Sequence, residues 1–163
     1  HLDIKHRDFM LNLILPNSYA KEINEARLWK VFQEAVSVLK LGDSASVTLR
    51  VTNNRVIRQF NRAWRGENTA TDVLSFENAF EDPETGEHYL GDIMISYETA
   101  RKQARAGDHS IQAEIEMLFV HGMLHLAGFD HADKEQWSQM TTLQDKILEN
   151  LGNPLLGGIQ YSE

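Results

Sequence analysis

Cysteine is absent from the 163 residues of this chain. Without thiols the protein can form no disulfide and offers no thiolate ligand, so any metal must be bound by histidine or carboxylate side chains. Long apolar runs are also missing. The best candidate, residues 9–15, is interrupted by Asn12, and a helix that spans a bilayer needs about 20 apolar residues. The first residues are rich in charge, so no signal peptide is evident, and we expect a cytoplasmic protein without membrane contact.

Charge of one sign dominates the composition, with 24 acidic against 16 basic residues and a net charge of −8. That total argues against a chain that binds nucleic acid over its whole surface. Between Arg50 and Gly66, however, there are five arginines and no acid. A hydrophobic fraction of 42% suits one globular domain over residues 1–163, with a tail from about residue 152 that we expect to be mobile.

The hydrophobic periodicity predicts an α+β fold with a mixed sheet of about four strands packed with helices. Residues 77–88 are polar and contain Pro and Gly, so we expect a long loop that joins the last two strands as a hairpin. The expected strands are 9–15, 46–52, 71–76 and 89–96, and the expected helices are 20–40, 53–64, 97–106, 110–127 and 133–150.

The predicted helix 53–64 and the residue that follows it separate an apolar stripe from a basic one. The apolar stripe consists of Ile57, Phe60 and Trp64, and the basic stripe of Arg55, Arg58, Arg62 and Arg65. An ordinary solvated helix face is one interpretation, although such faces usually mix both signs of charge. The other interpretation is a functional surface that binds phosphodiesters, because the guanidinium group suits bidentate contact with a phosphodiester.

Three of the seven histidines fall within residues 121–131. His121 and His125 are four residues apart, which places them on one face of a helix, and Gly128 can end that helix so that His131 approaches the same point. Three imidazoles with one open position are typical of a catalytic zinc site, so we predict one Zn²⁺ per chain. The alternative is that these are core or surface histidines with hydrogen-bond partners.

The helical zinc-peptidase motif H-E-x-x-H has its general base directly after the first histidine, but here Gly122 stands at that position. A peptidase is therefore disfavoured, and the base stays unidentified. Glu114 is a weak candidate for it, and Asp130 could either orient a metal ligand or form part of a turn. Asp92, inside an apolar strand, needs a partner, either the backbone or a histidine.

The segment HGMLHLAGFDH closely resembles the H-G-x-L-H-L-x-G-[YF]-D-H signature of the YbeY family of zinc-dependent bacterial endoribonucleases linked to ribosomal RNA maturation. The resemblance extends to an R-G segment, to T-D-V-L-S-F at 71–76 and to L-G-D-I at 90–93. The chain departs from the family at Ala70 and Glu77, where the family often has Pro. The resemblance implies that His121, His125 and His131 bind zinc, with His121 at the catalytic centre, and that Arg65 contacts the phosphate. It also implies single-stranded precursor rRNA as substrate and the ribosome or its small subunit as partner.

Three hypotheses remain open. The first is a metal-dependent endoribonuclease acting on single-stranded RNA during rRNA processing, in which a metal-activated water attacks a phosphodiester. The second is a zinc hydrolase with another substrate, such as a peptide, and the third is a ribosome-associated binding protein with a structural metal. The histidine spacing together with the arginine stripe favours the first.

Overall fold

A computed structural model describes residues 11–130 and 133–155 of the protein. Within these residues, a single four-stranded sheet forms one layer of the fold. Its strands lie in the order β1 (Leu11–Ile14), β2 (Ala45–Thr52), β4 (His88–Ser96) and β3 (Val73–Glu81). The first three run parallel, and β3 is antiparallel to β4 and forms an edge of the sheet. The predicted α+β fold with a mixed sheet is confirmed.

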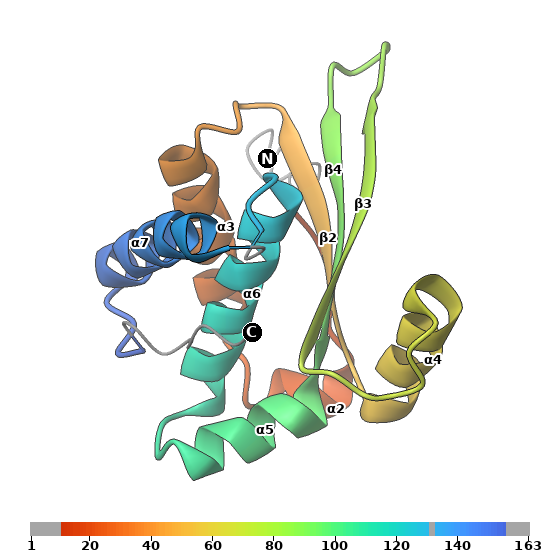
Figure 1. The fold of residues 1–163 in the computed structure, drawn as a ribbon, viewed down its shortest axis with the longest axis vertical. Coiled ribbons are helices and arrows are strands. Elements are labelled where there is room, and N and C mark those ends of the chain that lie inside the picture. Colours follow the sequence, from red (N-terminus) through yellow and green to blue (C-terminus); the bar gives the residue numbers. More distant parts are fainter. Residues whose placement is uncertain (1–10, 131–132, 156–163) are drawn as a thin grey trace.

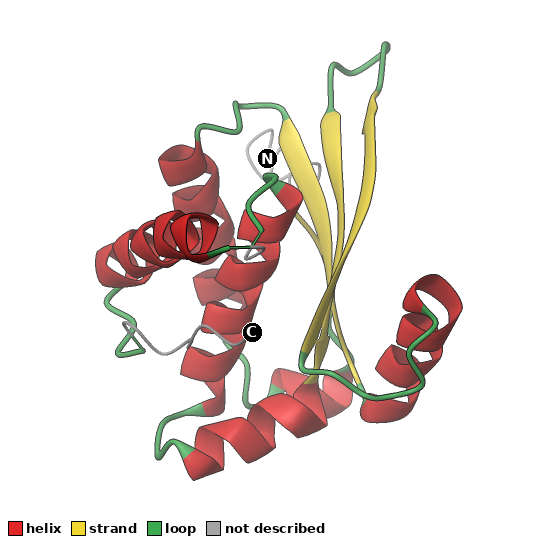
Figure 2. Ribbon diagram, in the orientation of Figure 1, coloured by secondary structure: helices red, strands yellow, loops and turns green. Residues whose placement is uncertain are grey.

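Helices cover both faces of this sheet unequally: α3, α6 and α7 lie together on one face, and α4 lies on the other (Figure 1). Figure 2 shows the same layers by type of structure. No helix among residues 11–130 and 133–155 has the length and apolarity that crossing a membrane requires. The helices are α2 (Asn17–Ala20), α3 (Glu25–Leu39), α4 (Asn54–Arg65), α5 (Tyr97–Ala106), α6 (Ile111–Leu126) and α7 (Lys134–Leu151).

Two boundaries differ from the sequence prediction. The helix expected from residue 20 begins at Glu25, because the Asn24 side chain accepts a hydrogen bond from the Arg27 amide and caps it there. The segment 77–88, predicted as a loop, is strand over its first part, since β3 continues to Glu81 and pairs with β4. Residues 77–81 are exposed, so backbone pairing holds them in the sheet without the apolar alternation by which a strand is recognised in sequence.

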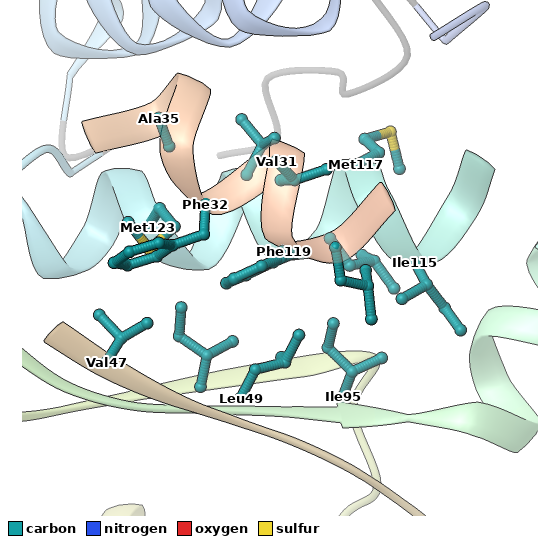
Figure 3. Packing of buried hydrophobic residues seen from close by; sticks show 14 of the residues in the cluster. Val31, Phe32, Ala35, Val47, Leu49, Ile95, Ile115, Met117, Phe119 and Met123 are labelled. Carbon is teal, nitrogen blue, oxygen red and sulfur yellow. The ribbon is translucent and has the colours of Figure 1, made fainter. Parts of the chain in front are cut away.

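Helix α6 is the centre of the core, with twelve of its sixteen residues buried, so it is enclosed on most sides. Phe119 of α6 lies between Phe32 of α3 and Leu49 of β2 (Figure 3). At Gly122 the helix lies close to the sheet, because a Cβ atom there would stand 2.7 Å from Cγ2 of Ile93 in β4. The absence of a side chain at Gly122 thus lets α6 lie directly against β4.

Asp92 in β4 finds a partner that the sequence analysis did not consider. The hydroxyl of Tyr89 donates a hydrogen bond to the Asp92 carboxylate, and it also lies 2.7 Å from the hydroxyl oxygen of Thr48. Burial, followed by the bond to Asp92, raises the pKa of Tyr89 to about 12. Among the described residues the partner found for Asp92 is thus a tyrosine hydroxyl, whereas the sequence analysis proposed the backbone or a histidine.

The start of the expected tail is held against α6. Asn153 is buried, and its amide nitrogen donates to the carbonyl oxygen of Ala113 and to Oε1 of Glu116, both at 3.1 Å. These bonds fix the chain just beyond α7. The mobile tail was expected from about residue 152 onward, and its residues 156–163 lie outside the described residues.

Candidate active site

A cleft of about 630 Å³ opens between the end of α4, the outer edge of β3 and the C-terminal half of α6. Segments far apart in sequence meet there, so that an arginine, two histidines and three carboxylates share one space. The cleft is lined by Arg65, Thr71, Asp72, Val73, Ser75, Glu77, His121, His125, Leu126, Gly128, Phe129 and Asp130.

Two of the three predicted metal ligands lie side by side in this cleft. The Nε2 atoms of His121 and His125 are 3.0 Å apart, and their rings meet edge to face. Two nitrogens bound tetrahedrally to one zinc ion would stand about 3.4 Å apart, so the pair is close to the spacing that a shared ion requires. Gly128 has a φ of +97° just after the end of α6, as its predicted role in turning the chain requires.

The third predicted ligand, His131, lies outside the described residues. Within 11–130 and 133–155, no three His, Cys, Asp or Glu side chains are grouped so as to hold a metal ion. The three-histidine site therefore stays a prediction, supported by the placement of His121 and His125.

Among the four arginines of the basic stripe, only Arg65 lines the cleft. Its Nη2 donates to the carbonyl oxygen of Ser75 on the outer edge of β3, at 3.4 Å, and α4 ends beside it at Gly66 with φ +71°. Arg58 instead donates to the side chain of Asn68 at 2.9 Å, and Arg55 and Arg62 are exposed on α4. The apolar stripe of this helix is only partly buried, since Trp64 is 70% exposed.

The position of Gly122 explains why the peptidase glutamate is missing. This residue faces Ile93 in the sheet, and its carbonyl oxygen accepts a hydrogen bond from the Ser75 hydroxyl at 3.3 Å. A glutamate there would meet the packed surface of β4 before it could reach a bound water. The geometry adds a steric argument against the peptidase hypothesis.

The two acids singled out in the sequence lie in different environments. Glu114 is buried near the start of α6, where its Oε1 pairs with Nε2 of His109 at 2.5 Å, and it does not line the cleft. Burial raises the pKa of Glu114, while its bond to His109 acts in the opposite direction. Asp130 is exposed and does line the cleft. Its predicted role in orienting a metal ligand remains a prediction.

Asp72 is a cleft residue that the sequence analysis missed. Its Oδ1 accepts a hydrogen bond from the amide of Val73 at 2.8 Å, and its Oδ2 accepts one from Nε2 of Gln103 at 3.2 Å. Burial raises the pKa of Asp72, and hydrogen bonds from backbone amides and from the Thr71 hydroxyl offset this rise only in part. An acid at the start of an apolar strand, within the T-D-V-L-S-F segment, was the available signal.

Comparison with known proteins matches the family described as "Endoribonuclease YbeY" over residues 15–152. This chain belongs to the YbeY family. An Endoribonuclease YbeY from Heliobacterium modesticaldum is 45% identical over 120 residues, which are 68% of this chain and 72% of that protein. Another, from Lysinibacillus sphaericus, is 36% identical over 155 residues, or 86% of this chain and 98% of the relative.

A solved structure shows the same fold. The solution structure of TM1509 from Thermotoga maritima superposes with a TM-score of 0.56 at 22% identity, covering 89% of this chain and 93% of that one. At this identity the likeness concerns the fold alone. The YbeY resemblance inferred from the histidine segment is confirmed by the family match.

Proposed function

We propose that this YbeY-family chain is a cytoplasmic single-domain endoribonuclease that cleaves single-stranded RNA during ribosomal RNA maturation. The observation that carries the proposal is the cleft in which Arg65 lies with His121 and His125. Relatives at 36–45% identity are named as endoribonucleases, which supports the same reaction here. Precursor rRNA is the proposed substrate, and the ribosome or its small subunit the proposed partner.

We further propose that His121, His125 and His131 hold one zinc ion per chain. Imidazole is a preferred ligand of zinc, and the 3.0 Å separation of the two described Nε2 atoms suits a shared ion. When bound, zinc supplies a Lewis acid and a nucleophilic water at neutral pH. Asp130, on the same cleft, is the proposed residue that orients a ligand histidine through a hydrogen bond.

Arg65 is proposed to bind the scissile phosphate and to stabilise the charge that develops on it during attack. The hydrogen bond to Ser75 directs its guanidinium toward the cleft, and four of its five N–H groups take no part in that bond. Arg55, Arg58 and Arg62 are proposed to attract the RNA backbone from outside the cleft, which accounts for a basic helix on an acidic protein.

The test compares Arg65→Ala with Arg62→Ala in the zinc-loaded protein, on single-stranded RNA and with rigorously nuclease-free preparations. Arg65→Ala is expected to lower kcat by about a hundredfold or more at unchanged zinc content. Arg62→Ala, on the same helix but outside the cleft, is expected to weaken RNA binding only modestly. Cleavage by Arg65→Ala at the parent rate, or cleavage that survives complete zinc removal, would refute the proposal and favour an RNA-binding protein with a structural metal.

A further inference from the structure

A second, smaller cavity of about 300 Å³ adjoins the cleft. The two spaces share Asp72, Val73 and His121 in their walls, so a ligand at the histidines borders both. The remaining walls of the smaller cavity come from α5, from α6 and from the segments that follow α5 and α7. These residues are Gln103, His109, Glu114, Met117, Leu118 and Leu155.

The polar wall of this cavity is built around the side-chain amide of Gln103. Its nitrogen donates to Oδ2 of Asp72 at 3.2 Å and to Oε2 of Glu114 at 3.4 Å. Because a carboxylate can only accept, these two contacts place the amide nitrogen toward the acids and the amide oxygen away from them. No described residue donates to that oxygen, and the wall therefore presents several acceptors.

Another part of the cavity wall is apolar. Met117 and Leu118 come from the buried face of α6, and Leu155 follows α7. A planar group with apolar faces and a polar edge fits such a space, whereas a phosphate does not, because Asp72 and Glu114 would repel it. Arg65 lines the adjoining cleft but not the smaller cavity, so phosphate and planar group are directed to different sides of His121.

We propose that the smaller cavity binds a nucleobase of the RNA next to the scissile phosphate and selects bases that carry an exocyclic amino group over uracil. This inference rests on the proposed endoribonuclease function and adds base selectivity to it. Single-stranded RNA can turn a base out of the chain and present its hydrogen-bonding edge to such a site. The amino group of cytosine or adenine donates two hydrogen bonds, which the acceptors of Gln103, Asp72 and Glu114 can receive.

The competing explanation is that the same residues only tie α5 to α6. The pairing of His109 with Glu114 already serves that purpose, since it joins the segment after α5 to the first turns of α6. A purely structural contact between the helices requires no cavity beside the histidines, and it predicts that RNA binding does not depend on base identity. Base dependence therefore separates the two explanations.

Cytosine and uracil are the decisive comparison, because they are alike in size and differ only along one edge, where cytosine has an amino group and an N3 acceptor and uracil a carbonyl and an N3–H donor. A wall of acceptors can receive two hydrogen bonds from the amino group of cytosine but only one from uracil. The binding measurement uses 2′-O-methyl oligouridine, with or without one central cytosine, and the zinc-loaded protein, with oligonucleotide integrity checked afterwards. We expect the parent to bind the cytosine oligonucleotide roughly tenfold more tightly. Gln103→Met, which keeps the side-chain length but removes its polar atoms, is expected to bring the ratio close to one.

Lys102→Met is the matched control, because it introduces the same side chain at the neighbouring exposed position of α5. It should keep the parent ratio, and both variants should unfold at temperatures close to that of the parent. Equal binding of the two oligonucleotides by the parent, or a preference that survives in Gln103→Met, would overturn the inference. Cleavage of unmodified RNA is measured in parallel, so that failure to cleave any sequence refutes the proposed function while the binding ratio still decides the inference.

Discussion

Replacing Arg27 by Met should destabilise the protein through the carboxylate that it leaves behind. Arg27 of α3 makes a bidentate contact with Glu116 of α6, with Nη2 to Oε1 at 2.7 Å and Nε to Oε2 at 3.0 Å. The Glu116 side chain is only 2% exposed, whereas that of Arg27 is 30% exposed. Met fills much of the same volume but cannot compensate the buried charge.

The expected loss in the free energy of unfolding depends on the hydrogen bonds that Glu116 keeps in the variant. Breaking a buried ion pair by removing one partner commonly costs about 3–5 kcal/mol. Here Gln112 and Asn153 still donate to the carboxylate, at 2.9 and 3.1 Å, and the partial exposure of Arg27 weakens the pair. We therefore expect a loss of about 2–3 kcal/mol at neutral pH, a large part of the about 5–15 kcal/mol that stabilises most domains.

The contribution of the Arg27–Glu116 pair to stability depends on pH. Burial alone would raise the pKa of Glu116, but hydrogen bonds from Arg27, Gln112 and Asn153 outweigh it and lower the pKa below its ordinary value of 4.5. The ionised Glu116 therefore contributes stability above the unfolded pKa, and this contribution is lost as the pH falls through the folded value. In Arg27→Met the folded pKa rises, so the difference from the parent is largest at neutral pH and shrinks in acid.

Urea unfolding of the parent and Arg27→Met at pH 7 and at about pH 4 measures this difference. Arg101→Met, at an exposed position of α5, is the control for loss of a positive charge. Arg27→Met/Glu116→Gln should recover part of the loss, because a neutral amide is less costly to bury without the guanidinium. A neutral-pH difference below about 0.5 kcal/mol, or one that does not shrink in acid, would refute the reasoning.

Three further outcomes are expected. Gly122→Ala should lower the free energy of unfolding by about 1–3 kcal/mol, because the added Cβ would lie 2.7 Å from Cγ2 of Ile93. An unchanged Tm in thermal unfolding would show that α6 can move away from β4. His125→Ala should lower the zinc content and abolish any rise in Tm on adding zinc, and unchanged zinc content would contradict its role as a ligand. Arg62→Ala should reduce the slope of log Kd for RNA against log salt by up to one, and an unchanged slope would place Arg62 away from the RNA backbone.

Most helices and strands could be predicted because local sequence decides them. Helix α5 spans residues 97–106 as expected, since Ser96 caps its start by accepting from the Thr99 amide and Gly107 follows its last residue. The short α2, whose four residues directly follow Pro16, was not predicted. Periodicity carries no signal for so short an element, just as it carries none for the exposed end of β3.

Residue spacing alone predicted the site only where its residues are close in sequence, whereas Arg65 was assigned to the same site through the family resemblance. His121 and His125 stand one helical turn apart, so their convergence follows from helix geometry. The meeting of Asp72 with Gln103 and Glu114 depends on how α5 and α6 pack beside the start of β3, which no local pattern encodes. The reason for a glycine at position 122 likewise became visible only when Ile93 was found opposite it.

The contact between Arg65 and Ser75 also has a consequence for solubility. Strand β3 is an edge of the sheet, and an uncovered strand edge can add a strand from another molecule. The guanidinium of Arg65 occupies the Ser75 carbonyl oxygen and places a positive charge along this edge, which discourages such pairing. We therefore expect the residue proposed to bind the phosphate to oppose self-association through β3 as well, because its replacement by alanine would leave the Ser75 carbonyl oxygen without this donor.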